Sequence, residues 1–406
     1  MEIVLASNFD DALVERTSDL PVSTFFGSYP TLRTGGGRPP RILPPVSEER
    51  FRQHVRAVHL AGRKFYGTLN TSDLGLHEYE PGYLDQFHRD LAHLLDMGVD
   101  GLVVALPALI EAIRDERPEV PISVSAVARI RSVTQAEYFL RLGADTIVLE
   151  EGNRDFALMR GLVRRGARVE VLVNETCLPA CPYRAHHLNT SSLSSMTGAV
   201  CPTFEYPMLQ CGLEYVRDPS KLISGIFVRP EDLAVLEEVG VSRFKISGRH
   251  RTTEWLARAA RAYAERRYEG DLTDILSLAQ VKGPKAALHQ LAATAPEETE
   301  ALGAAFAGLG RLSIDNAAFP KGFLRRIAAT DCDHQTCEEC GYCPSVAERV
   351  LRIDGSPPSR YRPPREMPVA IRMLNRLGGD RVPTATRGDG AKAVSAGNGS
   401  DLESSP

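Results

Sequence analysis

Eight cysteines, arranged in two groups of four, are the residues whose type and spacing point most directly to chemistry. The first group begins in NETCLPACPYRAHHLN and comprises Cys177, Cys181, Cys201 and Cys211. The second group, in DCDHQTCEECGYCPS, comprises Cys332, Cys337, Cys340 and Cys343, with His334 as a further candidate ligand. In a reducing compartment, clustered thiols bind metals more often than they form disulfides. We therefore interpret the chain as an iron–sulfur protein; the second group suits either a cluster or a structural zinc.

Other chemistry-bearing side chains follow the apolar run that ends at Val173. Glu175 is a candidate acid or base, and Arg184 is a candidate clamp for a carboxylate substrate. His186 is a candidate for proton transfer, although only one of the adjacent His186 and His187 is expected to face a site. The alternatives are an ion pair between Glu175 and Arg184 and an exposed pair of histidines.

A second set of cations surrounds the motif FKISGRH. Lys245, Arg249 and Arg229 form a candidate pocket for an anionic cofactor or substrate, and ordinary salt bridges are the alternative. Weaker candidates at the ends of other strands are Arg129, Glu150, Glu151, Asn8 and Asn70.

The elements that must position these residues form a repeated strand–helix pattern. The β-rich runs are Ile3–Ala6, Val22–Phe26, Lys64–Leu69, Gly101–Ala105, Ile122–Ala126, Thr146–Leu149, Val169–Val173, Gly225–Val228 and Phe244–Ile246. Gly98 and Gly143 each end a helical stretch before the next strand. Such alternation predicts a parallel sheet, and strands this apolar are buried on both faces.

We therefore predict an α/β fold with a TIM-like (β/α) barrel. Nine candidate strands exceed the eight of a closed barrel, so either Val22–Phe26 or Gly225–Val228 is expected to lie outside it. An open, doubly wound sheet is the alternative. The glycine run Gly35–Gly37 is interpreted as a mobile loop, because it does not join a strand to a helix as a phosphate cradle does.

Three regions are expected along the chain. Residues 1–250 form the barrel with the loop that carries Cys177 to Cys211. Residues 251–356 form a helical region that contains the motif from Cys332 to Cys343. Residues 357–406 are rich in Pro, Gly and Arg and form a tail, which is expected to be disordered from about Gly379.

Composition narrows the class of protein. The net charge is -4 and the arginines are scattered, so no basic surface of the kind that binds nucleic acid is expected. No apolar run reaches the roughly 18 residues of a membrane span. The first residues, MEIVLASNFDDALVE, carry acids where a signal peptide needs bases, which predicts a cytoplasmic protein.

The motif NETCLPACPYRAHHLN, the segment IFVRPEDLAVLEEVGVSRFKISGRHRTTEWL and the motif CDHQTCEECGYC together resemble the U32 collagenase-like peptidase family. The similarity runs from about Glu2 to Val350, although the first cysteine loop is spaced differently from that of the better-known branch. Members with clearer roles are similar to oxygen-independent hydroxylases that act on ubiquinone precursors or on RNA bases. The resemblance implies a 4Fe–4S cluster on four cysteines and, in some members, prephenate as the oxygen donor.

The resemblance and the residues together predict an iron–sulfur-dependent hydroxylase or related redox enzyme. Its substrate would be a small organic molecule or a nucleobase, with a prephenate-like oxygen donor. One 4Fe–4S cluster is expected, and a second cluster or zinc at the second cysteine group. Two alternatives are a non-catalytic accessory subunit that needs a partner protein, and a peptidase. A peptidase is disfavoured because the sequence has no His-Glu-x-x-His and no Gly-x-Ser-x-Gly motif.

Overall fold

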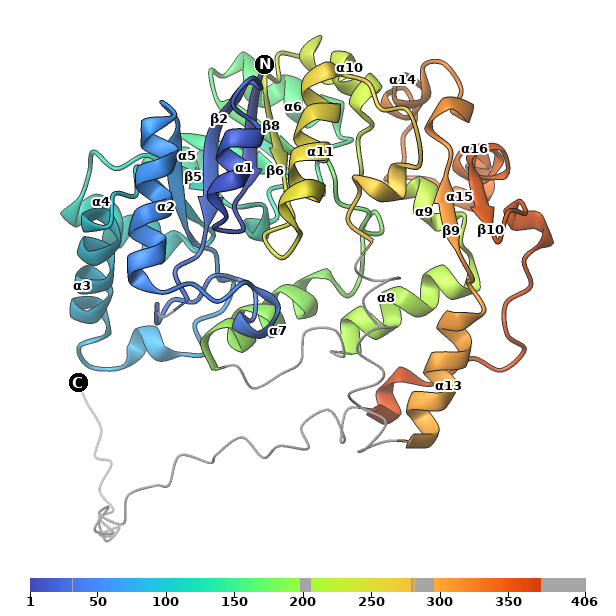
Figure 1. Cartoon of the computed structure of the whole chain (residues 1–406), viewed down its shortest axis with the longest axis horizontal. Helices are drawn as coiled ribbons and strands as arrows, with labels where there is room; N and C mark the ends of the chain where they lie inside the picture. Colours follow the sequence, from blue (N-terminus) through green and yellow to red (C-terminus); the bar gives the residue numbers. More distant parts are fainter. Residues whose placement is uncertain (31, 198–205, 279–280, 282–295, 374–406) are drawn as a thin grey trace, which may run out of the picture.

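The structure is a computed structural model that describes residues 1–30, 32–197, 206–278, 281 and 296–373. Its centre is a closed barrel of eight parallel strands surrounded by helices (Figure 1). The strands are β1 (Glu2–Ala6), β2 (Val22–Gly27), β3 (Lys64–Leu69), β4 (Gly101–Val104), β5 (Ile122–Val124), β6 (Thr146–Leu149), β7 (Arg168–Leu172) and β8 (Arg243–Ile246). The predicted TIM-like barrel is confirmed.

The barrel closes because β1 pairs in parallel with β8 as well as with β2, with Leu5 opposite both Phe25 and Ile246. Of the two runs in doubt, Val22–Phe26 is strand β2, whereas Gly225–Val228 forms no strand and follows a short helix. Closure excludes the open, doubly wound sheet.

Helices follow the strands, as the alternating pattern predicts. They are α1 (Asp11–Arg16), α2 (Glu48–Leu60), α3 (Tyr83–Asp96), α4 (Pro107–Glu116), α5 (Val133–Arg141), α6 (Phe156–Arg164), α7 (Arg184–Thr197), α8 (Tyr206–Arg217), α9 (Lys221–Ser224), α10 (Leu233–Glu237) and α11 (Thr253–Glu265). Gly98 and Gly143 lie just beyond α3 and α5 with φ of 93° and 97°, a left-handed conformation that glycine adopts without a steric cost. Both predicted helix stops are confirmed.

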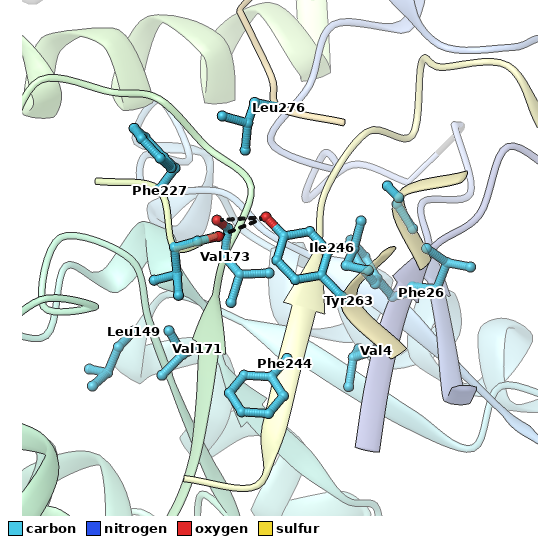
Figure 2. Close-up of a cluster of buried hydrophobic side chains, with 14 of the residues drawn as sticks. Val4, Phe26, Leu149, Val171, Val173, Phe227, Phe244, Ile246, Tyr263 and Leu276 are labelled. Atoms are coloured by element: carbon cyan, nitrogen blue, oxygen red, sulfur yellow. Dashed lines mark hydrogen bonds between the residues drawn. The ribbon is translucent and has the colours of Figure 1, made fainter. Parts of the chain in front are cut away.

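The barrel extends beyond the expected boundary at residue 250. Helix α11 packs against β1, β8 and α1, as the last outer helix of the barrel. Its Tyr263 is buried and donates its hydroxyl to the carbonyls of Val173 (3.3 Å) and Val228 (2.9 Å). Figure 2 shows this ring among the apolar side chains of β7 and β8, which include Val171 and Phe244. A boundary at residue 250 would leave this helix outside the barrel. The strand–helix alternation of the sequence stops near residue 250 because the last strand ends there, whereas the barrel ends only with the helix that follows that strand.

The C-terminal region contains α13 (Pro296–Ala307), β9 (Leu312–Ile314), α14 (Phe323–Ala328), α15 (Cys337–Cys340), α16 (Tyr342–Val350) and β10 (Leu351–Ile353). The region is helical for the most part, as predicted, and it also contains an antiparallel sheet of two strands, β9 and β10, which the sequence did not indicate. Strands of three residues are too short to show an alternating pattern in the sequence. Helix α16 packs against α9 and α13 against α8, so this region covers one side of the barrel (Figure 1).

The predicted tail begins against the folded part of the chain. Tyr361 is partly buried and donates its hydroxyl to the Val216 carbonyl at 2.9 Å. The part expected to be disordered, from about Gly379, lies outside the described residues. Among the helices that the structure describes, none has the length and apolar character needed to span a membrane.

The glycine run expected to be a mobile loop is instead packed over the end of the barrel. A side chain at Gly36 would collide with the Ser28 hydroxyl, and one at Gly37 would collide with the backbone of Asn70. Gly35 and Gly37 both have φ of 65°. Only glycine meets these demands of space and conformation together, so the run lets the backbone pass close to the strand ends.

A Ser–His–Asp array, with Ser7 and His54 buried and Asp11 partly exposed, lies beside the carboxyl end of β1. The His54 ring on α2 contacts the Ser7 hydroxyl through Nε2 and the Asp11 carboxylate through Nδ1, each at 2.7 Å. Because the carboxylate only accepts, Nδ1 carries the proton and the Ser7 hydroxyl donates to Nε2. Ser7 and His54 are both 0% exposed, and the rings of Phe9, Phe25 and Phe65 surround the imidazole.

Replacing His54 by Gln is expected to make the protein less sensitive to acid. Burial lowers the pKa of His54, and Asp11 only partly opposes this. A histidine whose folded-state pKa lies below its unfolded value contributes its full stability above about pH 6.5, and this contribution is lost as the pH falls further. Urea unfolding midpoints measured from about pH 8 to pH 5 should fall less steeply for His54→Gln than for the wild type. His59→Gln, on an exposed part of the same helix, is the control; equal slopes for His54→Gln and the wild type would contradict the assignment.

Candidate active site at the barrel mouth

The carboxyl ends of the strands surround a cavity of about 140 Å³. Strands and strand ends from β2 to β8 supply its walls, and α7 and α8 supply residues on its outer side. Catalytic residues of such barrels come from this end of the strands. The polar residues among the lining are Arg38, Thr68, Asn70, Ser125, Glu150, Glu175, Cys177, Cys181, Tyr183, Arg184, His187, Ser191, Cys211, Lys245, Ser247, Arg249, His250 and Ser277.

The segment after β7 that carries the first cysteine is held by backbone hydrogen bonds. The Cys177 carbonyl accepts from the Ile226 amide at 3.0 Å, and the Thr176 carbonyl accepts from the Tyr215 hydroxyl at 2.6 Å. The Asn174 carbonyl accepts from the Ser277 amide at 2.8 Å. Three separate parts of the chain therefore fix the position of Cys177.

Three thiols of the first cysteine group line the cavity. Cys177 and Cys181 lie in the loop after β7, and Cys211 lies on α8, whereas Cys201 lies outside the described residues. The seven cysteines that the structure describes are all free thiols. Burial raises the pKa of Cys177 to about 12 and raises that of Cys211 as well. These groups are therefore protonated thiols near neutral pH unless a metal displaces the proton.

As they stand, no three Cys, His, Asp or Glu side chains within the described ranges converge closely enough to hold a metal ion. The chemistry of the donors nevertheless fits an iron–sulfur cluster, because three thiols from two elements face one enclosed space.

Arg184 joins the thiol loop to the end of β6. Its guanidinium is ion-paired with Glu150, lies 3.7 Å from Glu151, and donates to the Cys177 sulfur at 3.1 Å. Burial raises the pKa of the Glu150 carboxyl, and Arg184 limits that rise. Burial alone would lower the pKa of Arg184, but Glu150 and Cys177 raise it well above its ordinary value. The expected partner, Glu175, is not the one observed: a weaker candidate, Glu150, takes that place.

The structure brings His187, and not His186, to the cavity. Arg184 begins α7, so His187 and Ser191 follow it at helical spacing on the same face, and all three line the cavity. His186 is exposed, with its ring 6.3 Å from that of Tyr206. Burial and the nearby charge of Arg184 lower the pKa of His187 to about 3. The prediction that His186 faces the site is therefore wrong, because its position on α7 turns it away from the cavity. The sequence alone did not show this, since the residue at which α7 begins was not known.

Glu175 lies where the sequence analysis expects it, at the cavity wall. It is buried, accepts a hydrogen bond from the Ser247 hydroxyl, and lies 3.9 Å from Arg38. Arg38 follows the packed glycine run and was missed from the sequence. The sequence signal that could have identified Arg38 is its position directly after three glycines, because such a run allows the backbone to approach the site closely.

The three candidate anion-binding residues do not come together. Lys245 and Arg249 line the cavity, but Arg229 lies elsewhere, where its guanidinium pairs with Asp232 at 2.7 Å and covers the Phe319 ring. Lys245 is paired with Glu170 at 2.8 Å. Arg249 has a different environment: it donates to the hydroxyls of Ser28 and Thr68 and to the Gly36 carbonyl.

The second cysteine group lies on the C-terminal region, apart from the residues that line the cavity. Cys337 and Cys340 lie at the two ends of the single turn α15, and Cys343 lies near the start of α16. The pKa of Cys343 is raised to about 11, mainly by burial; Arg154 opposes this rise, and the thiols of Cys337, Cys332 and Cys340 contribute to it. The four thiols are therefore near enough to influence one another.

Residues 44–158 match the model of Peptidase family U32. The predicted resemblance to the U32 family is confirmed. The matched residues run from before α2 into α6, and they include Glu150 and Glu151 but none of the cysteines. The family match therefore covers part of the barrel and leaves both cysteine groups outside it.

Two curated relatives are similar to this chain. "Uncharacterized protease MJ1657" of Methanocaldococcus jannaschii is 25% identical over 292 residues, which cover 71% of this chain and 78% of that protein. "tRNA hydroxylation protein P" of Escherichia coli K12 is 28% identical over 103 residues, which cover 25% of this chain and only 21% of that protein. Among solved structures, the U32 peptidase Mk0906 is 18% identical with a TM-score of 0.48, over 61% of this chain and 93% of that one.

Replacing Arg184 by Gln is expected to destabilise the fold by about 3–5 kcal/mol, because Glu150 would remain buried without its partner. The double variant Arg184→Gln/Glu150→Gln should recover most of that loss. Free energies of unfolding from urea titrations of the two single variants and the double variant give the coupling directly. Arg165→Gln, which breaks an exposed pair with Glu137, should cost no more than about 1 kcal/mol. Additive effects of Arg184→Gln and Glu150→Gln would show that the pair is not coupled.

Proposed function

We propose that this chain is an iron–sulfur-dependent enzyme that hydroxylates a small organic or nucleobase substrate without molecular oxygen. The observation that carries the proposal is the set of three thiols, Cys177, Cys181 and Cys211, that line one cavity at the carboxyl ends of the barrel strands. The similarity to a protein named for tRNA hydroxylation supports the choice of reaction.

In this proposal the cluster is held by Cys177, Cys181 and Cys211, with Cys201 as the fourth ligand. When bound, such a cluster supplies electron transfer and activation of an organic oxygen donor. Arg184 donates a hydrogen bond to the Cys177 sulfur, and hydrogen bonds to cluster sulfurs adjust the reduction potential. Glu150 holds Arg184 in place. Glu175 faces the same cavity and is the candidate for proton transfer.

The second cysteine group is proposed to hold another metal centre, either a cluster or zinc. Arg154, which follows β6, brings a positive charge from the barrel to this side of the C-terminal region. Its guanidinium lies 5.8 Å from the centre of the Phe323 ring. The Phe323 ring in turn stacks on Tyr342, the neighbour of Cys343. Burial lowers the pKa of Arg154 to about 10, and Cys343 and Cys332 oppose that change. A metal bound by four thiolates is anionic, so Arg154 would offset its charge.

Cys177→Ala, Cys181→Ala and Cys211→Ala are each expected to lose the iron bound at the first group and to keep any metal bound at the second. Without oxygen, the wild type should contain about four iron atoms and a matching amount of acid-labile sulfide per chain at the first group. The measurement is iron, sulfide and zinc analysis, with visible spectra, of protein purified anaerobically. Cys340→Ala is the matched control: it should keep the iron of the first group and lose the metal of the second. Stoichiometric zinc with no iron or sulfide, in aerobic and anaerobic preparations alike, would overturn the proposal.

Hydrolysis is the second candidate, since the matched family and one relative carry the name peptidase or protease. The geometry of Ser7, His54 and Asp11 also resembles a catalytic triad. However, Ser7 is 0% exposed and does not line the cavity, so a peptide carbonyl has no access to its hydroxyl. The array is better explained as a buried hydrogen-bonded support for the end of β1.

Ser7→Ala is accordingly expected to cost about 1–3 kcal/mol of stability, because His54 Nε2 would lose its buried partner. It should leave iron content unchanged. Gelatin and peptide hydrolysis by the wild type, before and after removal of iron, provides the functional measurement. Hydrolysis that persists without iron and disappears in Ser7→Ala would favour the peptidase.

A further inference from the structure

The charges around the cavity are almost all paired. Arg184 is paired with Glu150, Lys245 with Glu170 at 2.8 Å, and Arg38 lies 3.9 Å from Glu175. These pairs account for every charged residue of the cavity wall, histidines and thiols aside, except Arg249. Within the described part of the chain, no carboxylate lies within 4.0 Å of the Arg249 guanidinium.

Arg249 is buried, with only 8% of its surface exposed, although it has no carboxylate partner. Its Nη1 donates to the Thr68 hydroxyl at 3.1 Å and to the Ser28 hydroxyl, and its Nη2 donates to the Gly36 carbonyl at 2.9 Å. All three acceptors are neutral, so they orient the guanidinium without balancing its charge. Burial lowers the pKa of Arg249 to about 9, and the positive charge of Arg38 acts in the same direction.

A buried charge without a counter-ion is costly. Removing an ion from water costs several kcal/mol even after the protein relaxes around it. The surroundings are nevertheless shaped to hold this guanidinium, because glycine at position 36 is what allows a backbone carbonyl to reach it. A charged group that is held in place, buried and turned to a cavity is expected where a ligand supplies the opposite charge.

We propose that Arg249 binds a carboxylate group of a small ligand that enters the barrel cavity. The planar guanidinium matches a carboxylate in geometry. The rest of the wall includes apolar side chains, among them Phe26, Val103 and Met208, which suit the carbon skeleton of an organic acid better than inorganic phosphate. Lys245 and Arg229 are excluded from this role because each already has a carboxylate partner.

The proposed function is needed only to say what the ligand does, that is, whether it is the substrate or the oxygen donor. Binding of the carboxylate itself requires Arg249 and the cavity, not electron transfer. The two proposals can therefore fail separately, and the experiment measures them on the same preparation.

The test uses the full chain, purified anaerobically, with malonate as the probe, uncharged malonamide as its control, and inorganic phosphate as a separate arm. Malonate should raise the thermal midpoint of the wild type by about 2–4 °C when it is near saturation, whereas malonamide should not. Arg249→Met should weaken malonate binding, measured by calorimetry, by about tenfold or more. No malonate binding, equal binding by Arg249→Met, or a preference for phosphate would each overturn the carboxylate assignment.

Stability without ligand separates a binding role from a structural one. Arg249→Met should unfold at the same temperature as the wild type or higher, because it removes an uncompensated buried charge. Lys245→Met is the matched control and should unfold at a lower temperature, because the buried Glu170 would keep only one of its two cationic partners, Arg243. Destabilisation of Arg249→Met comparable to that of Lys245→Met would show that Arg249 supports the fold and would overturn the proposal. Iron and sulfide content, measured in parallel, reports on the proposed function alone.

Discussion

The pairing of β1 with β8 closes the sheet, and the arrangement of the site depends on that closure. Because all eight strands run parallel, their carboxyl ends meet at one mouth. Arg38, Glu150 and Arg249 follow three different strands and are far apart in the sequence, yet they line one cavity. In an open sheet the loops after β2 and β8 would lie at separate positions along an edge, and the glycine run could not bring Gly36 to Arg249.

Buried ion pairs join different parts of the barrel. Within the strands, Glu170 on β7 is paired with Lys245 and Arg243 on β8, which outweigh the effect of burial and lower the pKa of Glu170. Beyond the strand ends, Glu150 is paired with Arg184. The first set joins neighbouring strands, whereas the second joins a strand end to the loop that carries Cys177. Electrostatic pairing thus stabilises the barrel in one place and positions a candidate ligand in the other.

The sequence predicted the barrel well because its signals are local and repeated: apolar strands, amphipathic helices, and glycines at 98 and 143. It also located the Cys177 loop and Glu175 at a strand end. It could not assign partners to the charges, since pairing across loops depends on closure and not on spacing. The choice between His186 and His187 depended on where α7 begins. The strands β9 and β10 were not predicted, because three residues are too few to show the alternation of apolar and polar residues that marks a strand.

Burial distinguishes the two chemistries that the cavity and its surroundings could support. A cysteine nucleophile needs a lowered pKa, whereas burial raises the pKa of Cys177 to about 12 despite the nearby Arg184. A serine nucleophile needs access to substrate, and Ser7 has none. Metal binding imposes neither requirement, since a metal displaces the thiol proton and is itself enclosed by its ligands. The same burial that disfavours hydrolysis is therefore compatible with a cluster, and Arg184 is placed to stabilise the resulting thiolate at Cys177.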